Sequence, residues 1–93
     1  MSMPTKKDEI VRLYKRFVEE GNSPYDHWGF LFYLRKHGVE IHENPPSRID
    51  ILKESTAIYD DGVLVIKRLP TFPTSFGIYL RHPDGTLWVV GYY

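Results

Sequence analysis

The stretch that decides the fold reads Trp28-Gly29-Phe30-Leu31-Phe32-Tyr33-Leu34, and it is the densest apolar run of the chain. Helix signals stand on both sides of it. Ser23 is a good N-cap, and Gly38 can adopt the left-handed conformation that ends a helix. At about 100° per residue, apolar side chains occupy nearly every side of such a helix, and a helix of this kind is normally surrounded by protein. The stretch therefore predicts a central core helix in which Trp28 and Leu31 are largely buried.

The segment before it predicts a first helix. Thr5 can cap this helix, with Asp8 at the third position as in a capping box. Apolar residues follow at helical spacing, at Ile10, Leu13, Tyr14, Phe17 and Val18. Gly21 and Asn22 then leave only a short link to the next helix, so we expect the two helices to pack as a helical hairpin.

The segment after the second helix is harder to interpret. The alternation in residues 39–42 predicts a short edge strand, and Asn44-Pro45-Pro46 predicts a break. Residues 47–54 are compatible with a helix, because Ser47 and Asp50 have capping spacing, but Ile49 and Ile51 alternate as in a strand. We favour a short third helix.

From Thr56 onward the apolar residues alternate with a period of two. Asp60-Asp61-Gly62 predicts one hairpin turn, and His82-Pro83-Asp84-Gly85 predicts a second. Between them, Pro70 and Pro73 lack the amide hydrogens that a central strand needs, so residues 69–74 are expected to form a loop. This pattern predicts an antiparallel meander of about four strands.

Together these elements predict an α+β fold in which two or three N-terminal helices pack on one face of a C-terminal antiparallel sheet. The 93 residues are enough for one domain with a single modest core. Residues 1–43 form its helical hairpin and short edge strand, and residues 44–93 form mostly the β meander.

Composition narrows the range of functions. Lys and Arg number 12, as do Asp and Glu, and the signs balance within each half of the chain, whereas phosphate-backbone binders usually carry a positive excess. The absence of cysteine excludes disulfides, thiolate catalysis and Cys-ligated zinc, and fits a reducing cytoplasm. The four histidines do not show metal-site spacing, so we expect neither a metal nor another cofactor. The longest apolar run is too short for a membrane span, and we expect a cytoplasmic protein without membrane association.

Aromatic residues make up 15% of the chain, more than so small a core can hide completely. If alternate residues of the strand at 75–81 face the helices, Tyr79 and Arg81 face away from them. The register of the last hairpin decides whether Trp88 and Tyr92 share that outer face. The candidate binding site, an aromatic and basic sheet face, consists of Tyr79, Arg81, Trp88, Tyr92, Lys67 and Arg68.

Such a surface suits a small non-enzymatic interaction domain that binds a protein partner or a second copy of itself. Single-stranded nucleic acid is a second possible target, because bases stack on aromatic rings and phosphates attract guanidinium groups, although the neutral net charge disfavours it. A winged-helix DNA-binding domain is a poorer fit, because its wing tip would carry Asp60 and Asp61.

A small metal-independent ribonuclease is the alternative from a different class. Such an enzyme needs a cation for the phosphate and a group that transfers protons, which Arg81, His82, Lys67, Arg68 and Tyr92 could supply. The order of helices followed by four strands is loosely similar to that of small ribonucleases of the RelE and barnase kind. The similarity concerns the fold, which hosts many functions, and does not extend to a residue-by-residue motif.

Overall fold

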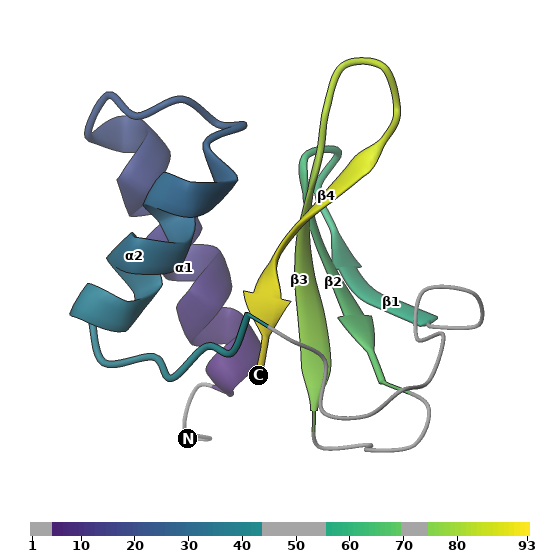
Figure 1. The fold of residues 1–93 in the computed structure, drawn as a ribbon, viewed down its shortest axis with the longest axis horizontal. Coiled ribbons are helices and arrows are strands. Elements are labelled where there is room, and N and C mark those ends of the chain that lie inside the picture. The colour runs from purple at the N-terminus through teal and green to yellow at the C-terminus, as the bar shows by residue number, and fades with distance from the viewer. Residues whose placement is uncertain (1–4, 44–55, 70–74) are drawn as a thin grey trace.

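A computed structural model describes residues 5–43, 56–69 and 75–93, which form two layers: a pair of helices and a four-stranded sheet (Figure 1). The helices are α1 (Lys6–Glu19) and α2 (His27–Lys36). The strands are β1 (Thr56–Asp60), β2 (Leu64–Arg68), β3 (Phe76–Arg81) and β4 (Leu87–Tyr92). Neighbouring strands are antiparallel, in the order β1-β2-β3-β4. The predicted α+β class is confirmed. Neither described helix is long and apolar enough to cross a membrane.

Helix α1 begins where its sequence indicates. The Thr5 hydroxyl accepts a hydrogen bond from the Asp8 amide at 3.2 Å, and the Asp8 carboxylate accepts one from the Thr5 amide at 3.3 Å. This reciprocal pair satisfies amides that have no partner within the helix. The predicted apolar stripe faces inward, with Ile10, Leu13, Tyr14 and Phe17 all buried.

Helix α2 begins later than predicted. Its N-cap is Asp26, whose carboxylate accepts a hydrogen bond from the Gly29 amide at 3.0 Å. The Ser23 hydroxyl instead accepts from the Tyr25 amide, within a turn that precedes the helix. The Tyr14 hydroxyl donates to the Pro24 carbonyl at 2.8 Å, which ties this turn to α1. Burial and the charge of Asp61 raise the pKa of Tyr14 to about 12, so the phenol remains a donor at neutral pH. Gly38 has a φ of 84°, as predicted for the end of α2.

Only part of α2 is buried. Phe30, Leu31 and Leu34 face the core, whereas Trp28 is 53% exposed and Phe32 is 58% exposed. The prediction for Leu31 is confirmed, and the prediction that Trp28 is buried is wrong. A two-layer fold explains the difference, because α2 contacts α1 on one side and β4 on another. The remaining side of α2 faces away from α1 and from the sheet.

The core lies between the helices and the inner face of the sheet. Phe30 packs edge-to-face against Tyr14, with ring centroids 5.1 Å apart, and lies 5.5 Å from Phe17. The sheet contributes fully buried side chains from its two central strands, including Ile66 and Ile78. Aromatic contacts therefore join the two helices, and aliphatic side chains complete the core beneath them.

Both hairpin turns form where the sequence predicts them. Gly62 and Gly85 have φ values of 102° and 89°, which residues with a Cβ rarely adopt. At the first turn, the Asp61 carboxylate accepts hydrogen bonds from the amides of Val63 and Leu64. The acidic residues at this tip therefore hold the turn in shape.

The predicted short edge strand at residues 39–42 is reduced to one bridge. His42 and Tyr92 exchange two backbone hydrogen bonds, both of 2.8 Å, and thereby attach the segment after α2 to the end of β4. Gly91 permits this close approach, because a Cβ at this position would meet Ile41 and the His42 carbonyl. The predicted third helix at 47–54, the break at 44–46 and residues 70–74 of the predicted loop at 69–74 lie outside the described residues.

Strand β4 contains a bulge. Ile78 pairs with Gly91, but the next residue of β3, Tyr79, pairs with Val89, so that Val90 is an extra residue on β4. An extra residue reverses the alternation of side chains between the two faces of the strand. Residues before and after the bulge that would share a face in a regular strand therefore lie on opposite faces.

The unequal burial of α2 can be tested with a pair of variants. Phe30→Ala should lower the free energy of unfolding by about 3–5 kcal/mol, because it leaves a cavity between the helices. Trp28→Ala should lower it by about 1 kcal/mol or less, because half of the side chain is already exposed. Urea denaturation followed by circular dichroism measures both. An equal loss in the two variants would contradict the described orientation of α2.

Candidate functional site

The outer face of the sheet brings together three of the predicted site residues, Tyr79, Tyr92 and Lys67. The Tyr79 and Tyr92 rings lie edge to face with centroids 6.5 Å apart, and the Lys67 ammonium lies 5.9 Å from the Tyr79 ring. Gly77 leaves room for the Tyr79 phenol, which a Cβ at this position would meet. However, Tyr79 is completely buried and Tyr92 is only 7% exposed. Burial raises the pKa of both phenols. The rings therefore support this face and do not present a surface for stacking.

Arg81 is engaged within the protein. Its guanidinium donates two parallel hydrogen bonds of 2.9 Å to the Asp60 carboxylate, and a third of 3.2 Å to the Gly62 carbonyl. Bidentate pairs of this geometry are strong and directional. The hydrogen bond from Arg81 is the main cause that holds the pKa of Asp60 below its usual value. Arg81 therefore attaches the β1–β2 turn to β3.

Arg68 lies apart from the other predicted site residues. It pairs with Phe76, whose side chain belongs to the core, so Arg68 lies on the helix side of the sheet. There it lines a shallow hollow with Lys6 and Lys7 from the start of α1. Lys6 forms an ion pair with Glu9, and Lys7 forms one with Asp8. The two lysines of this hollow are therefore already paired with acidic residues of α1.

Trp88 also lies on the helix side, away from Tyr79 and Tyr92. It pairs with Leu80, whose side chain is in the core, and it precedes the bulge that places Tyr92 on the outer face. Its ring lies 5.2 Å from that of His27 and 4.6 Å from that of His82. Trp88 is 47% exposed. The bulge therefore divides the predicted site and brings Trp88 to the start of α2.

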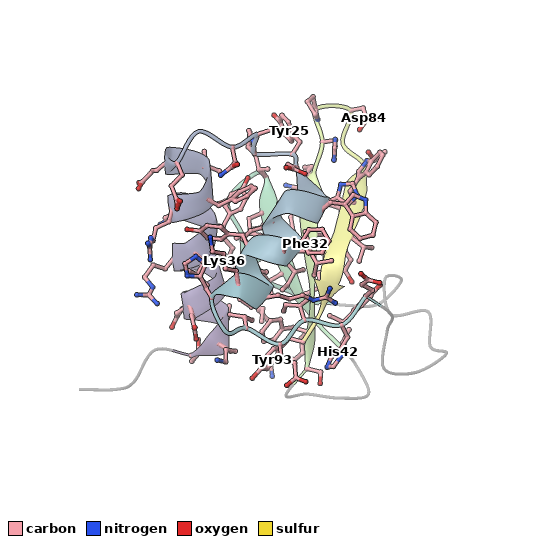
Figure 2. The ribbon with its side chains drawn as sticks, turned by 60° about the vertical axis from the view of Figure 1, so that its left-hand side comes forward. Tyr25, Phe32, Lys36, His42, Asp84 and Tyr93 are labelled. Atoms are coloured by element: carbon pink, nitrogen blue, oxygen red, sulfur yellow. The ribbon has the colours of Figure 1, made fainter. Side chains whose placement is uncertain are left out.

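At this position Trp88 is part of a continuous row of rings that we call the aromatic surface. From Phe32 the row passes to Trp28 at 6.3 Å, to His27 at 5.6 Å and to Trp88 at 5.2 Å. It continues to His82 at 4.6 Å and ends at Tyr25, a further 5.4 Å away. Figure 2 shows Phe32 on the surface of α2, and Tyr25 together with Asp84 at the end of the molecule where α2 begins. The aromatic surface consists of Tyr25, His27, Trp28, Phe32, His82 and Trp88.

Trp28, Phe32 and Trp88 are the large apolar side chains that the structure describes as exposed, and all three belong to this surface. Sequence reasoning included only Trp88 in its candidate site. One signal for the others was present: Trp28 and Phe32 are four residues apart and therefore lie on the same side of a helix, with Phe30 and Leu31 on other sides. Which side faces solvent was decided by packing between layers.

Two carboxylates border the aromatic surface. Asp26 is the N-cap of α2 and directly precedes His27. Asp84 lies in the β3–β4 turn, where its carboxylate accepts a 2.6 Å hydrogen bond from the Thr86 hydroxyl. That hydroxyl in turn accepts a 3.1 Å hydrogen bond from the Trp88 indole nitrogen. The Thr86 side-chain bond is the main cause that lowers the pKa of Asp84. A chain of hydrogen bonds thus links the Asp84 charge to the Trp88 ring.

The histidines do not form a metal centre in the described part of the chain. Among residues 5–43, 56–69 and 75–93, no group of three His, Asp or Glu side chains is arranged to hold a metal ion. His27 and His82 instead pack against Trp88 on either side in the row. The Nε2 atom of His82 is buried and has no hydrogen-bond partner among these residues.

The groups proposed for a ribonuclease are dispersed. Arg81 is paired with Asp60, Arg68 lies on the other side of the sheet, and Tyr92 is buried. His82 faces the Trp88 and Tyr25 rings. Lys67 shares the outer face with Tyr92, but burial limits access to that phenol and raises its pKa. These residues therefore do not place an accessible proton-transfer group beside a cation.

Comparison of the chain with protein-family models, with curated proteins and with solved structures finds no match. The aromatic surface must therefore be interpreted from its own geometry.

The Arg81–Asp60 pair predicts a component of acid sensitivity. In the unfolded chain Asp60 titrates near its usual pKa of 3.8, and in the folded protein its pKa is lower. The stabilisation is therefore complete above pH 3.8 and is lost as the pH falls from there through the folded pKa. Asp60→Asn should be less stable than wild type at neutral pH and should lose less stability on acidification. Urea denaturation at a series of pH values measures this, and parallel pH profiles for the two proteins would contradict it.

Proposed function

We propose that this protein is a small non-enzymatic interaction domain that binds a protein partner through the aromatic surface. The observation that carries the proposal is the gathering of Trp28, Phe32 and Trp88 at one place while each is about half exposed. Burying large rings in water-excluded contacts supplies much of the binding energy of protein interfaces, and Trp is enriched among the residues that contribute most. Leaving such rings in water without a partner gives up that energy.

The origin of the rings supports a recognition surface. Tyr25, His27, Trp28 and Phe32 come from α2 and the turn before it, whereas His82 and Trp88 come from the β3–β4 hairpin, about 50 residues later in the chain. Trp88 is held by its hydrogen bond to Thr86, and Trp28 and Phe32 stand on a helix anchored by Phe30. Rings carried by regular elements are pre-organised, so less conformational entropy is lost on binding.

A protein partner fits better than nucleic acid or a ribonuclease substrate. The segments that supply the surface, residues 22–34 and 82–93, contain no Lys or Arg, and each contributes one Asp. Phosphate groups would meet negative charge there. The dispersed Arg81, Arg68 and Tyr92 give no support to the ribonuclease alternative. The absence of cysteine suits a role in the reducing cytoplasm.

Peptide selection against the folded domain tests the proposal. Peptides selected from a random displayed library should bind the wild type and should lose about tenfold or more in affinity with Trp88→Ala or Phe32→Ala. Tyr59→Ala is the matched control, because it removes a partly exposed ring of β1 outside the aromatic surface, and it should leave the affinity unchanged. Isothermal titration calorimetry measures the affinities, and thermal melts confirm that each variant is folded. Peptides that bind all three variants as they bind wild type would show that the aromatic surface is not the site.

A further inference from the structure

We propose that the aromatic surface recognises a partner segment with exposed Arg or Lys side chains, which bind over Trp28 and Trp88 and between the carboxylates of Asp26 and Asp84. This inference rests on the proposed function and specifies the chemistry of the partner. It depends on three properties of the surface: the type of ring, the placement of the carboxylates and the absence of Lys and Arg from the segments that supply the rings.

The rings are suited to cations. The indole is the best of the protein side chains for cation–π binding, because the face of its π-system is negative. Trp28 and Trp88 lie on either side of His27, with ring centroids 5.6 and 5.2 Å from the imidazole. Both indoles remain about half exposed. The aromatic surface therefore contains two indoles close together. A partner segment with two basic residues could place one cation over each of them.

The carboxylates are fixed beside these rings. Asp26 is held by its bond to the Gly29 amide, and Gly29 has no Cβ to displace the Asp26 side chain, which a Cβ would meet. Asp84 is held by Thr86, which also orients the Trp88 indole. An Arg or Lys over an indole would therefore find a carboxylate in a defined position at the border of the surface. Ion pairs and cation–π contacts would then act on the same side chain.

The two arginines closest to the aromatic surface are engaged within the protein. Arg35 lies one turn beyond Phe32 on α2, and its guanidinium donates to the Ile41 carbonyl at 2.9 and 3.2 Å. It also lies 3.6 Å from the Glu43 carboxylate. Arg81, which precedes His82, is paired with Asp60. The segments that supply the rings, residues 22–34 and 82–93, therefore carry the two carboxylates of Asp26 and Asp84 and no Lys or Arg, and the exposed Lys36 lies one turn beyond Phe32, at the end of the row away from Trp88.

The same charges disfavour a second copy as the partner. In a twofold dimer the same patch meets itself, so Asp26 and Asp84 of both protomers would come together across the interface. Like charges placed opposite each other oppose association. A different chain with basic residues is complementary in sign, and this consideration selects it over self-association.

Intrinsic fluorescence provides a direct readout, because Trp28 and Trp88 are the two tryptophans of the chain and both belong to the surface. The full-length chain is titrated with short peptides of alternating Arg and Gly, and with peptides of alternating Glu and Gly. The Arg peptide should change the emission in a saturable manner, with an affinity that falls as salt is added. The Glu peptide should produce no saturable change.

Charge-removing variants isolate the carboxylates. Asp26→Asn/Asp84→Asn removes both charges, while Asn still serves as an N-cap and as a turn residue. This double variant should bind the Arg peptide about threefold more weakly or worse at low salt. Glu19→Gln/Glu40→Gln, which removes two exposed carboxylates outside the surface, is the matched control and should bind like wild type. Trp88→Ala should weaken binding about 2- to 30-fold, read from the emission of Trp28.

The outcomes separate this inference from the proposed function. If the Glu peptide binds as well as the Arg peptide, or if Asp26→Asn/Asp84→Asn binds like wild type, the cationic partner is excluded while the aromatic surface remains the site. If Trp88→Ala has no effect either on the Arg peptide or on the library-selected peptides, both proposals fail. Sedimentation that shows a dimer dispersed by Trp88→Ala would identify a second copy as the occupant and overturn the inference.

Discussion

The bulge in β4 is the constraint on which the arrangement of the surface depends. Because Val90 is inserted opposite the Ile78–Tyr79 step, the strand presents Trp88 to the helices and Tyr92 to the outer face. A regular strand would place both rings on one face. With the bulge, Trp88 joins His27 and His82, and Tyr92 closes over the sheet beside Tyr79. One extra residue thus converts a single aromatic sheet face into a buried outer layer and an exposed row of rings.

Helix α2 combines two roles through its aromatic residues. Phe30 lies against Tyr14 and Phe17 and joins the helices, while Trp28 and Phe32, on another side of the same helix, remain in solvent. Asp26 serves both sides, because it caps the helix and carries one of the two charges that border the aromatic surface. The high apolar content of this segment therefore reflects a core and a contact surface together.

The features that local chemistry determines were predictable from the sequence. The capping box of Thr5 and Asp8 and the turn at Gly62 depend on neighbouring residues, and both form as expected. Features that depend on distant residues were not predictable. Ser23 and Asp26 are both good N-cap residues, so the neighbouring sequence does not decide which of them begins α2. In the structure Asp26 is the N-cap, and the Tyr14 hydroxyl donates to the Pro24 carbonyl in the turn before the helix. The exposure of Trp28 depends on where the sheet lies. The face of the sheet on which Trp88 lies depends on the bulge in β4. In the sequence, the signal for this bulge is Gly91, a glycine within a strand.

The pairing of His42 with Tyr92 has a consequence for how the chain folds. The helical pair and the β meander are each built from contacts between segments close in sequence, and such units form quickly. The His42–Tyr92 bridge is the backbone pairing that joins these two units within the described residues, and its partners lie in the first and second halves of the chain. Its formation must wait until a long loop has closed, which costs chain entropy. The row of rings spans α2 and β4, so neither the helical pair nor the β meander carries it alone, and the surface exists only when the two halves of the chain are joined.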